Sequence, residues 1–383
     1  MPGKNSFITK PTPEKALLAG VEKRDNPDKW PLSESMFELA ELARSVGANP
    51  VITVTQKIHG SQPTYVGKGK LMEIVGHVKH NQIKIVILDD ELRPSQQKVL
   101  EEKLQVKVID RTALIIDLFA QRARSREGKL QVDLAQTEYL LPRLAGQWSH
   151  LERLGGGIGT RGPGETQIET DRRLVRSKLS KIKKEINKIQ KQRRQQRNLR
   201  RVTNKASVSI VGYTNAGKSA LFNQLTAGRG VEKNQLFSTL DTTTRQIQLN
   251  RHSNVTISDT VGFVSKLPSI LVSAFKTTLE EASEADLFLH VVDVSNDYSF
   301  EKYEIVNQML TQLSLAQTPS ILVLNKIDLL KEGKRETIER WKDFLQIFNV
   351  DDRTPIAITS ATKHYGLKRL KNLMENKIQQ GNN

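Results

Sequence analysis

The sequence predicts an α/β protein in three parts, and three observations lead to that prediction. The 383 residues suggest two or three domains, at about 100–200 residues each. Short runs rich in Val and Ile alternate with helical stretches at both ends of the chain, which is typical of mainly parallel sheets covered by helices. The middle shows only helical periodicity. We therefore expect a small N-terminal α/β domain (residues 1–111), a helical hairpin forming an antiparallel coiled coil (112–204), and a C-terminal α/β domain with a mainly parallel sheet (205–383).

The N-terminal domain is predicted from apolar runs and the helices between them. Strands are expected at 16–21, 51–54, 83–89 and 106–109, and helices at 33–46, 71–81 and 95–104. Ser33 and Ser95 are expected N-caps, and Gly47 is expected just beyond the first helix. The acidic run Asp89-Asp90-Glu91 favours a solvated, helix-capping loop over a metal or nucleotide site. The run 67–70 (GKGK) lacks the spacing of a phosphate-binding loop and favours the start of a helix.

The middle segment predicts two helices joined by a glycine-rich loop. The pattern is helical from 112 to 154 with a break near Gly128, six glycines follow between 155 and 164, and a long helix is expected over 171–201. A seam with alternating spacings of four and three residues needs a partner surface; it comprises Val175, Leu179, Ile182, Ile186 and Ile189. The preceding amphipathic helix offers Leu130, Leu134, Leu141 and Leu144. A homodimeric coiled coil is the alternative arrangement.

The net charge of +17 is concentrated on the long helix. Residues 172–201 carry 14 basic side chains and one acidic side chain. A solvated helix face normally mixes signs, because opposite charges four residues apart stabilise it. The segment therefore favours a polyanionic partner, and its lack of aromatic residues favours phosphate contacts on folded RNA or a duplex over stacking on single strands. A merely solvated helix face is the alternative.

The composition excludes several classes of protein. The chain has no cysteine, which excludes a disulfide framework, a thiolate metal site and a cysteine nucleophile. No apolar run approaches the ~20 residues of a membrane span, and the first residues lack the apolar core of a secretory signal. We expect a soluble, cytoplasmic protein.

A phosphate-binding loop carries the most specific chemical signal. The strand-forming run 208–211 leads into Gly212-Tyr213-Thr214-Asn215-Ala216-Gly217-Lys218-Ser219, and a helix is expected over 220–225. This is GxxxxGK[ST] in its strand–loop–helix context. Glycines let backbone N–H groups converge on phosphate oxygens at a helix N-terminus. Lys218 is expected to reach the β- and γ-phosphates as a catalytic residue, and the Ser219 hydroxyl to bind Mg²⁺.

Three later motifs, each at the end of a predicted strand, indicate guanine rather than adenine. Asp259-Thr260-Val261-Gly262 could hold Mg²⁺ through water at Asp259 and sense a γ-phosphate at Gly262. Asn325-Lys326-Ile327-Asp328 follows the run 320–324, and the Asp328 carboxylate can accept two hydrogen bonds from guanine that adenine cannot donate. Backbone N–H groups of Thr359-Ser360-Ala361 can meet the guanine carbonyl. Ligands gather at the carboxyl ends of parallel strands in such sheets.

Together these motifs resemble those of the HflX family of translation-factor-type P-loop GTPases. The resemblance rests on GYTNAGKSALFNQLT at 212–226, FSTLDTTTR at 237–245, DTVGF at 259–263, NKID at 325–328 and a glycine-containing signature over 128–173. It covers about residues 15–380. It implies a C-terminal P-loop GTPase domain and binding of GTP and GDP with Mg²⁺.

The resemblance also assigns a switch segment. It implies that Thr239 binds Mg²⁺ when GTP is present and takes part in catalysis, and that Phe237, Ser238, Thr239, Leu240 and Asp241 order around the γ-phosphate. The residues alone leave Thr242, Thr243 and Thr244 as alternatives to Thr239. Phe263 stands where many GTPases place a glutamine that orients water, so we expect slow intrinsic hydrolysis, on the order of 10⁻⁴–10⁻² s⁻¹, with the water-orienting group unassigned.

The resemblance further implies a ribosomal partner. We expect a monomeric GTPase that binds the 50S subunit or the 70S ribosome and its rRNA. Its expected role is ribosome splitting or rescue under stress, or late subunit assembly. Two alternatives stay open: an RNA remodelling enzyme that also uses ATP, and a membrane-associated signalling GTPase whose basic segment binds acidic lipid. The basic helix lacks an aromatic apolar face for membrane insertion, which disfavours the second.

Overall fold

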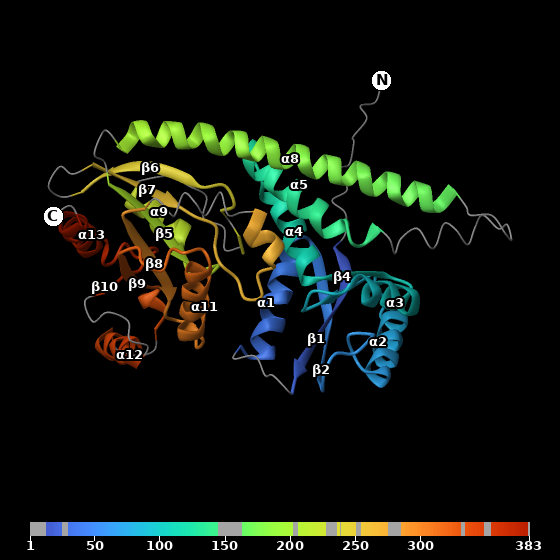
Figure 1. The fold of residues 1–383 in the computed structure, drawn as a ribbon. Coiled ribbons are helices and arrows are strands. Elements are labelled where there is room, and N and C mark those ends of the chain that lie inside the picture. Colours follow the sequence, from blue (N-terminus) through green and yellow to red (C-terminus); the bar gives the residue numbers. More distant parts are fainter. Residues whose placement is uncertain are drawn as a thin grey trace, which may run out of the picture. The chain divides into compact units, whose positions relative to one another are not determined.

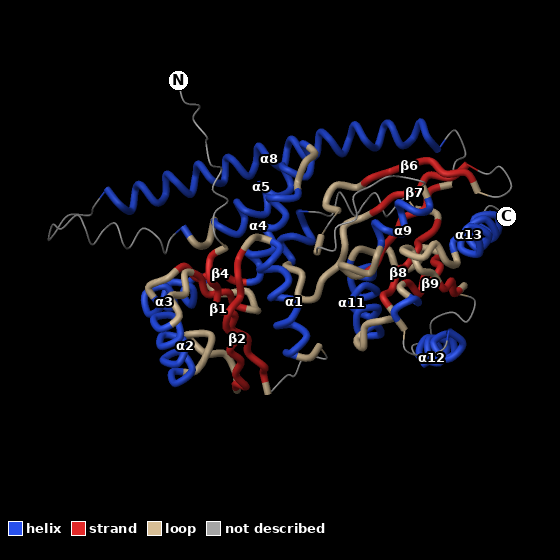
Figure 2. Tube along the Cα trace, turned by 180° about the vertical axis from the view of Figure 1, so that it is seen from behind, coloured by secondary structure: helices blue, strands red, loops and turns tan. Residues whose placement is uncertain are grey.

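The computed structural model describes residues 13–24, 30–144, 163–201, 206–226, 236–237, 239–249, 254–274, 285–330, 334–347 and 354–381. The chain divides into two compact units, Met1–Ile115 and Ile116–Asn383. Figures 1 and 2 show the elements of each unit from opposite sides. No helix among the described residues combines the length and the apolar character that a membrane crossing requires.

The first unit is built on a four-stranded parallel sheet with the order β2-β1-β3-β4. Along β1, Leu17 and Ala19 pack with the residues of α2 and α3. A Cβ on Gly20, on the opposite face, would collide with Met36 of α1. The sheet is therefore covered on both faces. The elements are β1 (Glu14–Lys23), α1 (Leu32–Ser45), β2 (Ala48–Ile58), α2 (Lys68–His80), β3 (Ile85–Leu88), α3 (Pro94–Leu104) and β4 (Lys107–Asp110).

The helix boundaries in this unit correct two expected caps. Gly47 lies just past α1 with φ +93°, as expected of a glycine beyond a helix, and α2 begins directly after Gly67. Ser33 and Ser95 do not cap, because each lies inside the first turn: α1 begins after Pro31 and α3 after Arg93. In α3 the proline at position 94 starts the helix one residue early, since its fixed φ suits the first helical position.

The second unit contains a six-stranded sheet with the order β10-β9-β8-β5-β7-β6. Its strands run parallel except for the edge strand β6, which pairs antiparallel with β7. Side chains of α9 and α13 pack on one face, and those of α11 and α12 on the other. The elements are β5 (Ser207–Gly212), α9 (Lys218–Leu225), β6 (Thr243–Gln248), β7 (Asn254–Asp259), β8 (Leu287–Asp293), α11 (Ser299–Gln312), β9 (Ser320–Asn325), η1 (Ile327–Leu329), α12 (Lys334–Ile347), β10 (Ile356–Ile358) and α13 (Leu367–Gly381).

The helical segment consists of α4 (Arg111–Arg122), α5 (Arg126–Leu140) and α8 (Pro163–Arg201). The expected break falls at residues 123–125 instead of at Gly128, because Ser125 caps α5 by accepting the Gly128 N–H at 2.9 Å. The Gly-rich loop lies mostly outside the described residues.

Helix α8 packs on α5 through the predicted seam. Leu179, Ile182 and Ile186 are buried, as are Leu134 and Ala135 of α5. Three ion pairs flank this contact: Arg126–Glu185 (2.8 Å), Lys178–Asp133 (2.6 Å) and Lys183–Glu138 (2.7 Å). The seam therefore has the partner surface within this chain that the hairpin prediction requires.

Candidate nucleotide-binding site

The phosphate loop leaves β5 and enters α9 at the carboxyl end of the sheet. Two glycines are required by their surroundings. Gly217 has φ +91°, and a Cβ there would collide with the Asn325 amide, whereas a Cβ on Gly212 would collide with the Val291 carbonyl of β8. The loop therefore holds its shape against β8 and β9, with the backbone free to meet a phosphate.

Lys218 begins α9 and is 6% exposed. Its Nζ donates to the Tyr213 carbonyl at 2.8 Å, within the phosphate loop. Burial lowers the pKa of Lys218 to about 8, and the nearby Asp259 carboxylate opposes that shift. An anionic phosphate in this loop would stabilise the charged ammonium by the same Coulombic effect as Asp259.

Three oxygens from separate segments converge beside Lys218. Ser219 Oγ lies 2.8 Å from Thr239 Oγ1, and both hydroxyls lie within hydrogen-bond distance of Asp259 Oδ2, at 2.7 and 2.8 Å. Adjacent ligands of an octahedral Mg²⁺ at its usual bond length stand about 2.9 Å apart. The spacing and the hard oxygen donors therefore fit this metal.

Asp259 itself is in an environment that favours a cation. It is 2% exposed, and its Oδ1 has no hydrogen-bond partner in the described part of the chain. Burial raises the pKa of Asp259, against the lowering effects of the Ser219 hydrogen bond, the Lys218 charge and the Thr239 hydrogen bond. A divalent ion would compensate both the buried charge and the unpaired oxygen. The described residues contain no group of three or more His, Cys, Asp or Glu side chains placed to hold a metal.

The motif 259–262 pairs with the phosphate loop. Thr214 N–H donates to the Phe263 carbonyl at 2.7 Å, and Phe263 N–H donates to the Gly212 carbonyl at 3.2 Å. A Cβ on Gly262 would stand only 2.8 Å from Lys218 Nζ, so the Gly262 backbone borders the phosphate position. Thr260 faces away, since its hydroxyl donates to the Ile210 carbonyl at 2.7 Å.

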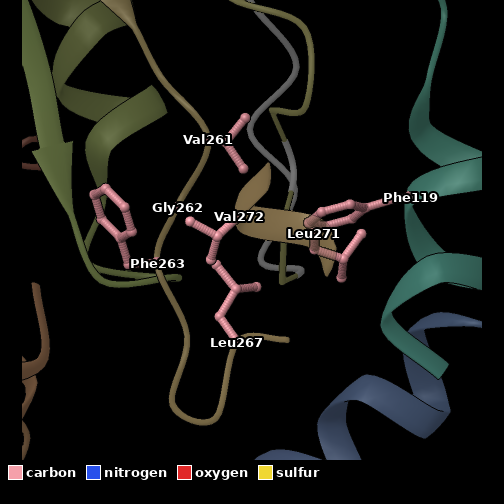
Figure 3. Close-up of a pocket in the computed structure, with 7 residues that line it drawn as sticks. All are labelled: Phe119, Val261, Gly262, Phe263, Leu267, Leu271 and Val272. Atoms are coloured by element: carbon pink, nitrogen blue, oxygen red, sulfur yellow. The ribbon is translucent and has the colours of Figure 1, made fainter. Parts of the chain in front are cut away.

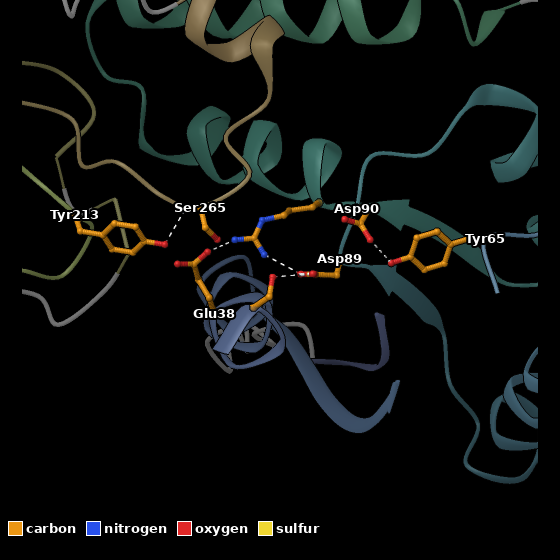
Figure 4. A network of polar contacts seen from close by, with 8 residues as sticks. Glu38, Tyr65, Asp89, Asp90, Tyr213 and Ser265 are labelled. Carbon is orange, nitrogen blue, oxygen red and sulfur yellow. Dashed lines mark hydrogen bonds and ion pairs between the residues drawn. The ribbon is translucent and has the colours of Figure 1, made fainter. Parts of the chain in front are cut away.

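The Phe263 ring lies in the core. It is 2% exposed and packs with Val211, Tyr213 and Phe288. The ring is therefore a core residue, and it offers no hydrogen bond that could orient a water molecule. Tyr213 closes this side by accepting the Ser265 N–H at 2.7 Å (Figure 4).

In the switch segment, the Thr239 hydroxyl lies beside Ser219 and Asp259, whereas the neighbouring described side chains point into the core or toward α5. Of the four threonines considered, Thr239 has its hydroxyl at Ser219 and Asp259, whereas Thr243 pairs with Asp259 through the strand backbone and the Thr244 hydroxyl contacts Ser258. Phe237 and Leu240 are buried, at 2% and 3% exposed. The Asp241 carboxylate accepts hydrogen bonds at the start of α5. Ser238 lies outside the described residues.

Asn325 joins three loops of the site, a role that the motif alone did not indicate. Its Nδ2 donates to the Ala216 carbonyl at 3.0 Å, while its Oδ1 accepts the Thr359 hydroxyl at 3.1 Å and the Ala361 N–H at 3.2 Å. Asn325 is 1% exposed. A guanine carbonyl would have to share the Ala361 N–H with Asn325, and three-centred hydrogen bonds of that kind are common.

The Asp328 carboxylate, which the sequence predicts to read the base, is exposed and lies next to the hydroxyl groups of Ser360 and Thr362. The Ser360 hydrogen bond lowers the pKa of Asp328, with further lowering by Thr362 and Lys363. Asp328 therefore stays ionised as an acceptor. Lys326 has φ +63° and pairs with Asp293 at the end of β8, Nζ to Oδ2 2.7 Å. Asp293 is a member of the site that sequence reasoning missed; its position at a strand end next to the site was the available signal.

A small apolar pocket lies beside Gly262 (Figure 3). Phe119 of α4 forms one wall, and residues that follow Asp259 form the others. The lining residues are Phe119, Val261, Gly262, Phe263, Leu267, Leu271 and Val272. Through Phe119, the helical segment therefore lines this pocket together with Gly262 and the residues that follow it.

The acidic run of the first unit has a structural role. Asp89 is fully buried and pairs with Arg111 at 2.9 Å, and the second guanidinium nitrogen pairs with Glu38 (Figure 4). Asp90 accepts the Tyr65 hydroxyl at 2.7 Å. The expected solvated loop is therefore wrong for Asp89, because the Arg111 charge compensates its burial.

The fold and the site define a P-loop GTPase. Three family models match: a GTP-binding GTPase N-terminal region over residues 33–120, a GTP-binding GTPase middle region over 122–200, and a 50S ribosome-binding GTPase over 207–326. The chain is a GTP hydrolase that binds GTP and GDP.

Curated relatives show the family. The chain is 50% identical over 319 residues to GTPase HflX of Caldanaerobacter subterraneus, covering 83% of this chain and 73% of that protein. It is 46% identical to GTPase HflX of Escherichia coli (83% and 74% covered) and 42% identical to that of Flavobacterium psychrophilum (96% and 85%). This chain belongs to the HflX family of GTPases.

Solved structures agree on the fold. A GTP-binding protein of Sulfolobus solfataricus in complex with GDP aligns with a TM-score of 0.50 at 22% identity, covering 96% of this chain and 99% of that chain. A second structure, of SsGBP with GDP, aligns with a TM-score of 0.52 at the same identity and coverage.

Proposed function

We propose that this chain is a GTP-controlled ribosome-binding protein whose helical segment contacts rRNA of the 50S subunit. In this proposal GTP orders the switch segment and favours the bound form, and hydrolysis releases it. The role is splitting or rescue of 70S ribosomes under stress, or late subunit assembly, in the cytoplasm. The family description "50S ribosome-binding GTPase" over residues 207–326 supports the partner.

At the nucleotide, the residues would divide the work as follows. Backbone N–H groups of 212–219 and Lys218 bind the phosphates, and Ser219 and Thr239 bind Mg²⁺ with Asp259 behind them. Gly262 borders the γ-phosphate, and Asp328 with residues 359–361 reads guanine. The convergence of the Ser219, Thr239 and Asp259 oxygens within 2.8 Å is the observation that carries this assignment.

Hydrolysis in this proposal is slow until a partner acts. Mg²⁺ would neutralise charge that develops on the phosphates, as Lys218 does from the other side. Phe263 is buried in the core and offers no hydrogen bond to water. We therefore assign the water-orienting step to the ribosome-bound state, in which a partner orders the switch segment or supplies a charge.

The RNA-contacting surface would be the side of α8 that faces away from α5. Exposed basic residues follow this side, whereas the seam residues Leu179, Ile182 and Ile186 are buried and Val175 and Ile189 are half-buried. They include Arg173, Arg176, Lys181, Lys184, Lys188 and Lys191. A run of exposed cations on one helix suits the phosphate backbone of folded RNA.

Sedimentation with ribosomal subunits tests this proposal. We expect co-sedimentation with 50S subunits when a non-hydrolysable GTP analogue is bound, and little with GDP or without nucleotide. Binding that is equal in all three states would contradict the proposed control by GTP. A competition titration compares the affinities for ATP and GTP. An affinity for ATP at least a hundredfold lower than that for GTP would exclude the ATP-driven alternative. Asp328→Asn should reduce this difference in affinity.

A charge variant tests the surface. Replacing Lys181, Lys184 and Lys188 with Gln should weaken 50S binding and reduce the salt slope, log K against log salt, by about two to three. The matched control replaces Lys342, Lys368 and Arg369, which are exposed on α12 and α13. An unchanged slope for the α8 variant would show that this helix does not contact phosphate.

A further inference from the structure

The switch segment does not end at the metal position. Two residues after Thr239, Asp241 Oδ2 accepts the N–H groups of Arg124 and Ser125, both at 2.8 Å. Asp241 Oδ1 accepts the Ser125 hydroxyl. These N–H groups lie directly before α5, which begins at Arg126 with Ser125 as its N-cap, so the helix itself offers them no carbonyl acceptor. Hydrogen bonds to a carboxylate are about twice as strong as neutral ones.

Ser125 and Gly128 shape the seat of this carboxylate. The Ser125 hydroxyl accepts the Gly128 N–H at 2.9 Å while it donates to Asp241, so it serves the helix and the switch segment together. A Cβ on Gly128 would collide with Asp241 Oδ1. Glycine at this position in α5 is therefore what leaves room for the carboxylate.

An aromatic contact reinforces the same junction. The rings of Phe119 on α4 and Phe237 in the switch segment meet edge to face, with centroids 4.7 Å apart, and both are 2% exposed. Phe237 has φ +51°, an uncommon backbone conformation for a bulky residue, which its surroundings must hold. The switch segment is thus attached to the helical segment on both sides of Thr239.

We infer that Asp241, Ser125 and Gly128 form a latch that positions Thr239 for GTP hydrolysis, so that helix α5 acts as a positioning element of the GTPase site. Because Thr239 lies two residues from Asp241, its Cα can be at most ~7 Å from the Asp241 Cα. The latch therefore raises the population of the conformation in which Thr239 meets Ser219 and Asp259. This inference rests on the proposed role of Thr239 as a Mg²⁺ ligand.

Two variants remove the latch by different routes. Asp241→Asn removes the negative charge. Gly128→Ala places a methyl group where the Asp241 carboxylate lies and leaves Asp241 itself unchanged. Because alanine has a higher helix propensity than glycine, this second variant should not destabilise α5. In both, we expect the dissociation rate of a non-hydrolysable GTP analogue with Mg²⁺ to rise about tenfold, corresponding to ~1.4 kcal/mol. The GDP dissociation rate should change less than twofold, and half-maximal hydrolysis should require more Mg²⁺.

The controls separate positioning from stability. Gly76→Ala on α2 adds a methyl group where nothing lies within 4 Å, and Asp343→Asn removes an exposed carboxylate on α12. Both should leave every rate unchanged. Ser125→Thr keeps the capping hydroxyl and should behave as the unmodified chain, whereas Ser125→Ala should shift the Mg²⁺ dependence in the direction of Asp241→Asn.

The result that would overturn the latch is specific. If Asp241→Asn and Gly128→Ala leave analogue dissociation and the Mg²⁺ dependence unchanged, or if they speed GDP and analogue dissociation equally, the contact is structural only. Thr239→Val tests the proposed role of Thr239 as a Mg²⁺ ligand, on which the latch depends. If Thr239→Val raises the Mg²⁺ requirement while the latch variants do not, the latch fails and the metal role stands; if Thr239→Val has no effect, the metal role itself fails.

Discussion

Asn325 shows how much one side chain can do inside this site. It is buried and uses both its donor and its acceptor on backbone or hydroxyl groups of two other loops. A buried partner left without a hydrogen bond costs about 1–3 kcal/mol. The Asn325 amide therefore holds the phosphate loop and residues 359–361 in place relative to each other.

Replacing Asn325 with Ala should lower the free energy of unfolding by about 2–4 kcal/mol. The affinity for GDP should also fall, because the loops that contain Ala216 and residues 359–361 lose the hydrogen bonds that connect them. Urea denaturation and GDP titration measure the two effects. Asn376→Ala, at an exposed position on α13, is the matched control. A stable Asn325→Ala protein with unchanged GDP affinity would refute this role of Asn325.

His290 is a buried neutral histidine in β8. It is 4% exposed, stacks on Tyr303 with ring centroids 4.6 Å apart, and burial together with the Lys218 charge lowers its pKa to about 3. The unfolded chain protonates this ring below pH 6.5, and the folded protein does not until about pH 3. The contribution of His290 to stability is therefore lost as pH falls through this window.

We expect this histidine to cost about 2 kcal/mol of stability between pH 7.5 and pH 5. His290→Phe keeps a stacking ring and cannot titrate, so its free energy of unfolding relative to the unmodified chain should improve by that amount over the same interval. Denaturant melts at the two pH values measure the difference. A constant difference between the proteins would contradict the assigned pKa.

The contact of α8 with α5 depends on apolar residues in a helix rich in basic side chains, and Leu179, Ile182 and Ile186 are the buried ones among the residues of α8 whose side chains the structure describes. Leu179, Ile182 and Ile186 are buried, whereas Leu174 on the same helix is 61% exposed. Helix propensity alone does not hold such an element in place, because packing of an amphipathic face provides most helical stability in proteins.

Ile186→Ala should therefore weaken the docking of α8 by about 2–4 kcal/mol. Amide hydrogen exchange in α8 should become faster, while exchange in β5, β8 and β9 stays slow. Leu174→Ala should have little effect on either. Equal acceleration in α8 and in the sheet would mean that the helix and the nucleotide-binding sheet unfold as one cooperative unit.

The chain has two compact units, and the candidate nucleotide site lies within the second, Ile116–Asn383. A ligand stabilises only what it binds, by about 2.7 kcal/mol at a hundred times its dissociation constant. GDP should therefore protect the second unit from unfolding selectively.

Scanning calorimetry with and without GDP, read with hydrogen exchange of each unit, measures this. We expect two transitions, of which GDP raises the one belonging to Ile116–Asn383. Asp328→Asn should reduce that shift. A single transition that moves as a whole with GDP would show that the two units unfold together.

The sequence predicted the parallel strands and the phosphate loop well, because each rests on local signals. The strand over 320–324 and the strand–loop–helix around 212–219 are found where expected. Contacts between distant segments could not be predicted in this way. Nothing near Asp241 indicates that its carboxylate meets residues 116 positions earlier.

Burial of charge was also beyond local patterns. An acidic run after a strand usually lies in solvent, but Asp89 is buried because Arg111, 22 residues later, lies beside it. The antiparallel direction of β6 likewise depends on its pairing with β7 and not on its composition. The nucleotide motifs were recognised by their order and spacing. The hydrogen bonds by which Asn325 connects the phosphate loop to residues 359–361 could be seen only in the structure.

The tie that Asn325 makes between the two loops also constrains how nucleotide preference could change. If Asp328 and residues 359–361 read the base as proposed, selecting another purine would require new groups at these positions. The amide that holds those residues also holds the Ala216 carbonyl, so it could not be exchanged along with them. A change of base preference would therefore have to be made in the residues around Asn325, because replacing Asn325 itself would also remove the hydrogen bond to the Ala216 carbonyl in the phosphate loop.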